Sequence, residues 1–251
     1  SDVYKEKEST DSPETPEKPL YTKGYTHYVL GILLVVYTFN FIDRQILAIL
    51  AQSIKTDLDL SDTQIGALSG VAFGIFYATL GIPIARLADR YSRVNIIAIC
   101  LTIWSAMTAF SGLAQNFWHL LIARIGVGIG EAGGSPPSHS LFADYFPPDA
   151  RASALGIYAI GIPVGILFGN FAGGSINDVF GWRSAFFLVG LPGIALAIIL
   201  KLTIKEPPRG YSEGRVQKKV NIPFKQVLNT MWGYKSFRHL SMGAATQAFV
   251  G

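Results

Sequence analysis

The chain has 251 residues, of which 50% are hydrophobic and only 15% are charged, whereas soluble domains carry about 25% charged residues. This deficit argues against a soluble domain and favours a membrane protein, since roughly 20 apolar residues with few charges cross a bilayer as a helix. The formal charge of +4 reflects topology rather than nucleic-acid binding, because lysines and arginines gather between the apolar segments. Cys100 is the only cysteine, which excludes an internal disulfide and a cysteine metal cluster.

In chain order, residues 1–24 predict a polar, disordered tail without a signal peptide. A six-helix transmembrane bundle is predicted over 25–204, with helices at 26–52, 62–86, 92–114, 117–143, 150–176 and 183–204. Residues 205–236 predict a basic loop with a surface helix at 223–233. Residues 237–251 predict the start of a seventh helix, too short to cross, so we expect the first half of a longer protein.

The distribution of basic residues predicts the orientation of the chain. With the amino terminus inside, the inner segments hold 17 of the 21 lysines and arginines, and the outer loops hold only Lys55 and Arg183. Short loops rich in lysine and arginine stay in the cytoplasm. We therefore expect a multi-pass membrane protein with its amino terminus and the 205–236 loop in the cytoplasm.

Four charges lie inside predicted helices: Asp43, Arg44, Arg124 and Glu131. Counted from the helix ends at 1.5 Å per residue, they fall within a band of roughly 10 Å, which predicts a buried polar cluster. Such charges are costly in hydrocarbon and face a partner or a wet cavity. One interpretation is a permanently paired structural quartet. The other is a proton switch, with Asp43 and Glu131 as proton sites and the arginines as partners or contacts for a substrate anion.

The turn Ala85–Arg93 resembles the signature loop of the major facilitator superfamily, with Asp89, Arg90 and Arg93 matching and Ala85 and Ser92 replacing two glycines. The resemblance implies a charge lock between the two halves of the transporter. The alternative is that these arginines only enforce the topology.

Helices 4 and 5 carry further resemblances to the superfamily. Arg124, Gly128 and Gly130 resemble its second motif. Gly156, Gly165, Gly169 and Gly173-Gly174 resemble its antiporter motif, with Asn170 in place of a proline. We expect these glycines to give a flat face for the opposing half, and Asn170 to line the cavity.

Three longer stretches resemble the Spinster branch of lysolipid and sphingolipid transporters and their bacterial relatives: Phe39–Arg44, Arg124–Ala132, and Asp144–Pro147 with Arg151-Ala152. The resemblance covers roughly residues 25–210, and it implies a bacterial inner membrane as the location.

Together these observations predict an all-α membrane protein with the major facilitator fold, a six-helix N-terminal bundle and the start of helix 7. We expect a proton-coupled secondary transporter, moving an amphipathic, lipid-like substrate by alternating access around a midplane cavity. Asn40, Asn170, Arg44 and Arg124 are the predicted substrate contacts or charge partners. Membrane lipids and a C-terminal six-helix bundle are expected partners. No enzyme activity, cofactor, metal or nucleic acid is expected. No nucleotide-binding loop is present, so we expect the energy for transport to come from a gradient.

Two other functions fit the same residues. One is a carrier of a small organic anion or drug on the same fold. The other is a non-transporting membrane receptor or scaffold, although a scaffold gains little from four intramembrane charges.

Overall fold

The computed structural model describes residues 20–213 and 224–250. It divides into two units, one ending at Val216 and one beginning at Gln217, and each is described by itself. Most of the predicted tail, and residues 214–223 of the predicted loop, lie outside the described residues. The first unit is a bundle of helices, and no strand occurs in either described range.

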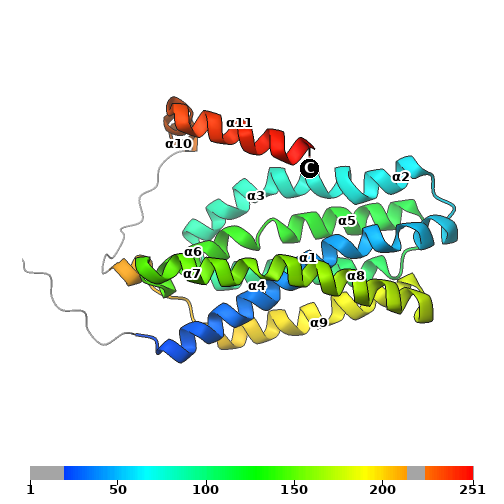
Figure 1. The fold of residues 1–251 in the computed structure, drawn as a ribbon, viewed down its shortest axis with the longest axis horizontal. Helices are drawn as coiled ribbons and strands as arrows, with labels where there is room; N and C mark the ends of the chain where they lie inside the picture. Colours follow the sequence, from blue (N-terminus) through cyan, green and yellow to red (C-terminus); the bar gives the residue numbers. More distant parts are fainter. Residues whose placement is uncertain (1–19, 214–223, 251) are drawn as a thin grey trace, which may run out of the picture. The chain divides into compact units, whose positions relative to one another are not determined.

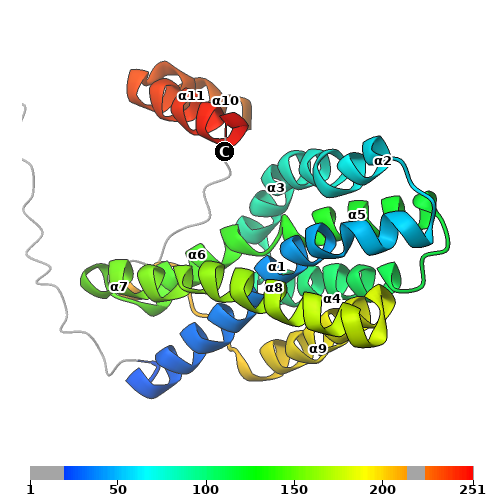
Figure 2. The same cartoon turned by 45° about the vertical axis from the view of Figure 1, so that its right-hand side comes forward.

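The bundle begins with one long helix and continues through shorter segments. Its elements are α1 (Lys23–Asp57), α2 (Asp62–Gly66), the π-helical turn η1 (Ala67–Val71), α3 (Ala72–Arg90), α4 (Arg93–Ser111), α5 (Phe117–Glu131), α6 (Ser135–Tyr145), α7 (Pro148–Ala159), α8 (Gly161–Phe180) and α9 (Trp182–Thr203). The long helices run side by side (Figures 1 and 2). We call the end of the bundle where α1 begins the proximal end, and the opposite end the distal end.

Five helical stretches are long and apolar enough to cross a membrane: Lys23–Asp57, Asp62–Arg90, Arg93–Ser111, Pro148–Phe180 and Trp182–Thr203. They match five of the six predicted spans. The predicted span at 117–143 consists of two helices, α5 and α6, separated after Glu131, and the sequence Ser135-Pro136-Pro137 predicts such a break or bend. The break has a local cause. Gly133 and Gly134 form the turn, and Pro136 and Pro137, which lack an N–H donor, sit in the first turn of α6, where that donor is not needed.

The second span is one continuous helical stretch with an irregular turn inside it. Ser61 and Gln64 form the capping box that their spacing predicts, because each side chain bonds the other residue's backbone N–H. The π-helical turn Ala67–Val71 follows, directly before the first residues of α3. Single π-turns of this kind are frequent at functional sites.

Close helix packing depends on glycines at a few contacts. A Cβ added at Gly165 would lie 2.6 Å from the Thr38 carbonyl oxygen, and one at Gly130 would lie 2.7 Å from the Trp104 nitrogen. Glycine therefore lets α8 approach α1, and α5 approach α4. The prediction that the helix 5 glycines face the opposing half is wrong for three of them. Gly165, Gly169 and Gly173 are buried against α1, and only the positions of Gly156 and Gly174 open onto free space.

Cys100 is buried on α4, where its sulfur fills the space beside Gly133 at the break between α5 and α6. The second unit contains α10 (Phe224–Gly233) and α11 (Lys235–Val250). α10 occupies the stretch for which a surface helix is predicted, and α11 the stretch for which the start of helix 7 is predicted.

Candidate functional site

The four intramembrane charges converge in the middle of the bundle, as their depth predicts. Asp43 and Arg44 come from α1, whereas Arg124 and Glu131 come from α5. Asp43, Arg124 and Glu131 are each at most 2% exposed.

This polar layer separates two hydrophobic cores. On α1 the proximal core ends at Val36 and the distal core begins at Ile46. Asn40 and Asp43 lie between those positions. The bundle therefore places the charges where the surrounding dielectric is low and where unpaired polar groups are expensive.

One ion pair closes within the cluster. The Arg44 Nε donates to Glu131 Oε2 at 2.8 Å. The Arg44 guanidinium also lies 4.8 Å from the ring centroid of Tyr77 and 5.2 Å from those of Phe41 and Phe73. Its side chain is 29% exposed, whereas that of Glu131 is fully buried. Arg44 thus connects a buried acid to the surface of the bundle, and it is held by aromatic faces from α1 and α3.

Asp43 has a different environment. It is 1% exposed, its Oδ1 has no hydrogen-bond partner, and no ion pair forms to it within residues 20–213 and 224–250. The Arg124 guanidinium and the Thr108 hydroxyl are its neighbours from α5 and α4, but neither completes a hydrogen bond to Oδ1. The two acids are therefore not equivalent: Glu131 is neutralised by an arginine, and Asp43 is buried without a closed pair.

The predicted asparagines lie in two different places. Asn40 is buried one turn before Asp43, next to Glu131, and its Oδ1 lacks a partner. Asn170 is exposed on α8, and its amide donates to the Ile166 carbonyl of the same helix at 2.9 Å. The structure therefore brings Asn40 into the cluster and leaves Asn170 outside it.

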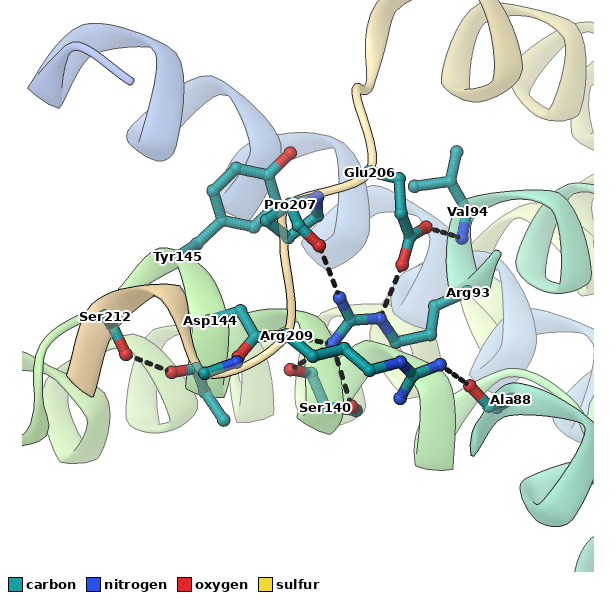
Figure 3. Close-up of polar contacts among 12 residues, drawn as sticks. Ala88, Arg93, Val94, Ser140, Asp144, Tyr145, Glu206, Pro207, Arg209 and Ser212 are labelled. Carbon is teal, nitrogen blue, oxygen red and sulfur yellow. Dashed lines mark hydrogen bonds and ion pairs between the residues drawn. The ribbon is translucent and has the colours of Figure 1, made fainter. Parts of the chain in front are cut away.

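At the proximal end, Arg93 is the centre of a second polar network (Figure 3). It begins α4 and is only 1% exposed. Its Nε donates to Glu206 Oε1 at 2.6 Å, and its other nitrogens bind the Asp144 carboxylate, the Ser140 carbonyl and hydroxyl, and the Pro207 carbonyl. Arg93 thus ties the start of α4 to the end of α6 and to the segment after α9.

That segment, residues 204–213, forms a strap across the proximal end of the bundle. The Arg209 guanidinium donates to the Ala88 and Tyr91 carbonyls at the end of α3. Gly210 adopts a positive φ of 74°, which favours glycine, and its N–H donates to Asp144 Oδ1 at 2.8 Å. Ser212, which is labelled in Figure 3, donates to the Ala143 carbonyl. The strap therefore joins α3, α4, α6 and α9.

Glu206 is the acidic centre of the strap. Burial alone would raise its pKa, but the Val94 N–H, the Arg93 guanidinium and the Ser92 hydroxyl bind the ionised carboxylate and hold the pKa below its ordinary value of 4.5. Glu206 therefore stays ionised wherever the pH is above that value.

The three residues of the predicted charge lock lie in different environments. Asp89 and Arg90 are exposed in the last turn of α3. Arg93 is buried and bonded within the chain. The sequence patterns predict no functional role for Asp144, Glu206 or Thr108. Asp144 and Glu206 are visible in the sequence as acids that precede Phe146-Pro147 and Pro207-Pro208. That both of them bind Arg93 becomes evident only in the fold.

Comparison with known proteins gives the family of the chain. Residues 33–251 match the model of the Major Facilitator Superfamily. An "MFS-type efflux pump" of Mycolicibacterium smegmatis is 40% identical over 175 residues, which are 70% of this chain and 41% of that protein. "Protein spinster homolog 1" of Bos taurus is 32% identical over 195 residues, which are 76% of this chain and 37% of that protein.

A solved structure is similar over most of the chain. The crystal structure titled as a bacterial homolog to human lysosomal transporter, Spinster, in an inward-facing and unoccupied conformation is 42% identical with a TM-score of 0.78. The match covers 92% of this chain and 54% of that one. The chain thus spans about half the length of the relatives it matches. It belongs to the major facilitator superfamily of membrane transporters, and its predicted resemblance to the Spinster branch is confirmed.

Proposed function

We propose that the full-length protein is a proton-coupled secondary transporter in which Asp43 carries the proton. The observation that supports this most strongly is the burial of the Asp43 carboxyl without an ion pair, beside a second acid that has one. A bare carboxylate in that position is costly, and a bound proton removes the cost. Asp43 can therefore change its charge as the cavity opens to one side or the other of the membrane.

Glu131 and Arg44 form the second part of the proposed switch. Their ion pair is intact when Asp43 is enclosed, and Arg44 reaches the exposed side of the bundle. An anionic substrate group that binds Arg44 competes with Glu131 for the guanidinium. Release of Glu131 then leaves a second buried acid that requires a proton, which couples substrate and proton movement.

The proposed substrate is amphipathic and lipid-like, with an anionic head. Arg44 supplies a cation for the head group, and Phe41, Phe73 and Tyr77 supply apolar surface next to it. Similarity to Spinster homologs supports this class. The alternative is a small organic anion or drug, and similarity to an efflux pump supports that alternative.

We also propose the inside-amino-terminus topology and an inter-half lock at Asp89 and Arg90. The proximal end carries most of the basic residues of the bundle, whereas the two distal basic residues are each paired with an aspartate. Arg183 binds Asp57 at 2.6 Å, and Lys55 binds Asp62 at 2.5 Å. A basic surface facing the cytoplasm is the favoured orientation. Asp89 and Arg90 lie exposed on that surface.

The test is substrate flux into proteoliposomes that contain the full-length protein, with and without a pH gradient. We expect Asp43→Asn to reduce gradient-driven lysolipid flux at least tenfold, because the amide cannot exchange a proton. Asp178→Asn is the matched control, since Asp178 is an exposed carboxylate on α8, and it should leave flux unchanged. Gradient-driven flux of small anions without lysolipid flux would favour the alternative substrate class. Absence of any substrate-dependent proton movement would favour the receptor or scaffold.

A further inference from the structure

The buried polar atoms that lack a hydrogen-bond partner are not scattered through the described residues. They are Asn40 Oδ1, Asp43 Oδ1, Trp104 Nε1, Thr108 Oγ1, Arg124 Nε and Glu131 Oε1. All six come from α1, α4 and α5. Buried polar groups in native proteins are normally satisfied, so a local concentration of open donors and acceptors requires an explanation.

Thr108 differs from two other hydroxyl residues of α4, Thr102 and Ser111. Threonine and serine inside a helix commonly donate to the carbonyl four residues earlier. Thr102 does so to Ala98 at 2.8 Å, and Ser111 does so to Met107 at 3.1 Å. Thr108, on the same helix and 1% exposed, has no such bond, and its hydroxyl lies next to Asp43. Its donor is therefore available to the carboxyl group.

The charged groups around Asp43 leave a neutral donor on α4 as the available hydrogen-bond partner of its carboxyl group. Arg124 and Glu131 face it from α5, and Arg44 follows it on α1. Arg44 is held by Glu131, and Arg124 Nε remains without a partner. The carboxyl therefore lacks a closed bond to either arginine when Glu131 is ionised and paired.

We propose that Thr108 is a positioning residue for Asp43, donating its hydroxyl to the Asp43 carboxylate, directly or through a buried water, whenever the proton has left. The open atoms of Asn40, Arg124 and Glu131 supply the further polar partners that a buried water needs. This inference rests on the proposed role of Asp43 in proton coupling. In this proposal, Thr108 on α4 binds the deprotonated Asp43 carboxylate, whereas Arg44 binds the substrate.

The experiment compares Thr108→Val, which keeps the shape and removes the hydroxyl, with Thr108→Ser, which keeps the hydroxyl. Thr102→Val is the matched control, because it removes a hydroxyl from the same helix that is bonded within that helix. In purified full-length protein, the carboxyl band of Asp43 is identified in infrared difference spectra by its loss in Asp43→Asn. It is then titrated against pH, which requires no transport activity.

We expect Thr108→Val to move the titration midpoint of Asp43 to higher pH by about one unit, a tenfold change in proton affinity, because the carboxylate loses a donor. Thr108→Ser should restore the midpoint, and the pH profile of flux should move with the infrared titration. A Thr108→Val midpoint equal to that of Thr102→Val would overturn the positioning role while leaving Asp43 as the proton site. If Asp43→Asn retained full gradient-driven flux, the proposed function would fail, and the infrared midpoints would still decide the role of Thr108.

Discussion

At the scale of single residues, Arg93 shows how one buried cation can hold three segments together. Its guanidinium binds Asp144 from α6 and Glu206 from the strap, and it also satisfies the Ser140 and Pro207 carbonyls. A buried pair contributes little compared with an apolar replacement, but removal of one partner leaves an uncompensated charge. Loss of Arg93 is therefore costly mainly because it leaves two carboxylates without their cation, whereas the net contribution of the intact ion pairs is small.

Arg93→Ala should destabilise the full-length protein by about 3–5 kcal/mol, because two carboxylates lose their shared cation. Thermal unfolding in detergent measures this as a lowered midpoint temperature. Lys23→Ala, at an exposed position at the start of α1, is the control and should change the midpoint little. Equal shifts in the two variants would show that the network does not stabilise the protein.

The sequence predicts the charged members of the central cluster and misses their neutral partner. Charges inside apolar helices are rare enough to stand out, and helix rise alone places Asp43, Arg124 and Glu131 within a band of roughly 10 Å. Thr108 does not stand out, because hydroxyls are common in membrane helices and usually bond within their own helix. Whether Asp43 or Glu131 forms the ion pair also depends on how α1 and α5 are rotated about their own axes. The hydrophobic pattern does not determine that rotation closely enough to predict the pair.

At the scale of elements, the contact between α1 and α8 depends on glycine at defined positions. Gly165 has the Thr38 carbonyl and the Phe41 Cβ within 2.6 Å of the place where its own Cβ would be. The spacing of the helix 5 glycines is visible in the sequence, but their partner is not. They pack on α1 within the bundle, because α8 crosses α1 there.

Gly165→Ala should destabilise the protein by roughly 1–3 kcal/mol, as overpacking does in a close-packed interface. Gly24→Ala near the start of α1 is the control, since no atom lies within 4 Å of its added Cβ. It should be neutral, or slightly stabilising, because alanine favours the helix. Thermal unfolding of the two variants side by side tests the assignment, and a neutral Gly165→Ala would contradict it.

Helix ends were easier to predict than helix interiors. The Ser61 capping box and the proline pair at the start of α6 have local causes that the sequence displays. The π-helical turn Ala67–Val71 was not predicted. It inserts an irregular turn into an otherwise regular helix, and no single residue type marks it.

At the scale of the whole molecule, the strap makes the proximal end sensitive to acid. The folded-state pKa of Glu206 lies below its ordinary value of 4.5, so its contribution to stability is fully present above that value. The contribution is lost as the pH falls through the lower folded-state pKa. Acid should therefore loosen the joint between α9 and the start of α4.

We expect Glu206→Gln to lower the free energy of unfolding by roughly 2 kcal/mol at neutral pH, because charge-assisted bonds are replaced by weaker ones. The difference from the unmodified protein should shrink as the pH falls below 4.5. This pH dependence is tested by unfolding midpoints of both proteins, measured from pH 3 to pH 7, about the range over which a glutamate titrates. A difference that is constant across the range would contradict the assignment, and Asp178→Asn should show no such convergence.

The overall class of the fold follows from composition and charge pattern, since segment length and the asymmetry of basic residues are global properties. The strap could not be predicted in the same way. Several of its bonds join residues more than 100 positions apart, such as Arg93 with Glu206 and Arg209 with Ala88. Residues 204–213 contain no helical period from which their path could be inferred.

The contact between Cys100 and Gly133 gives the molecule an intrinsic chemical reporter. The sulfur is the only thiol in these 251 residues, and it occupies the space that a side chain at position 133 would need. Cys100 is 7% exposed, so we expect alkylation of that thiol to become faster whenever α4 moves away from the break that follows Glu131. The rate of labelling at Cys100 should therefore report how often the helix that carries Thr108 separates from the helix that carries Glu131.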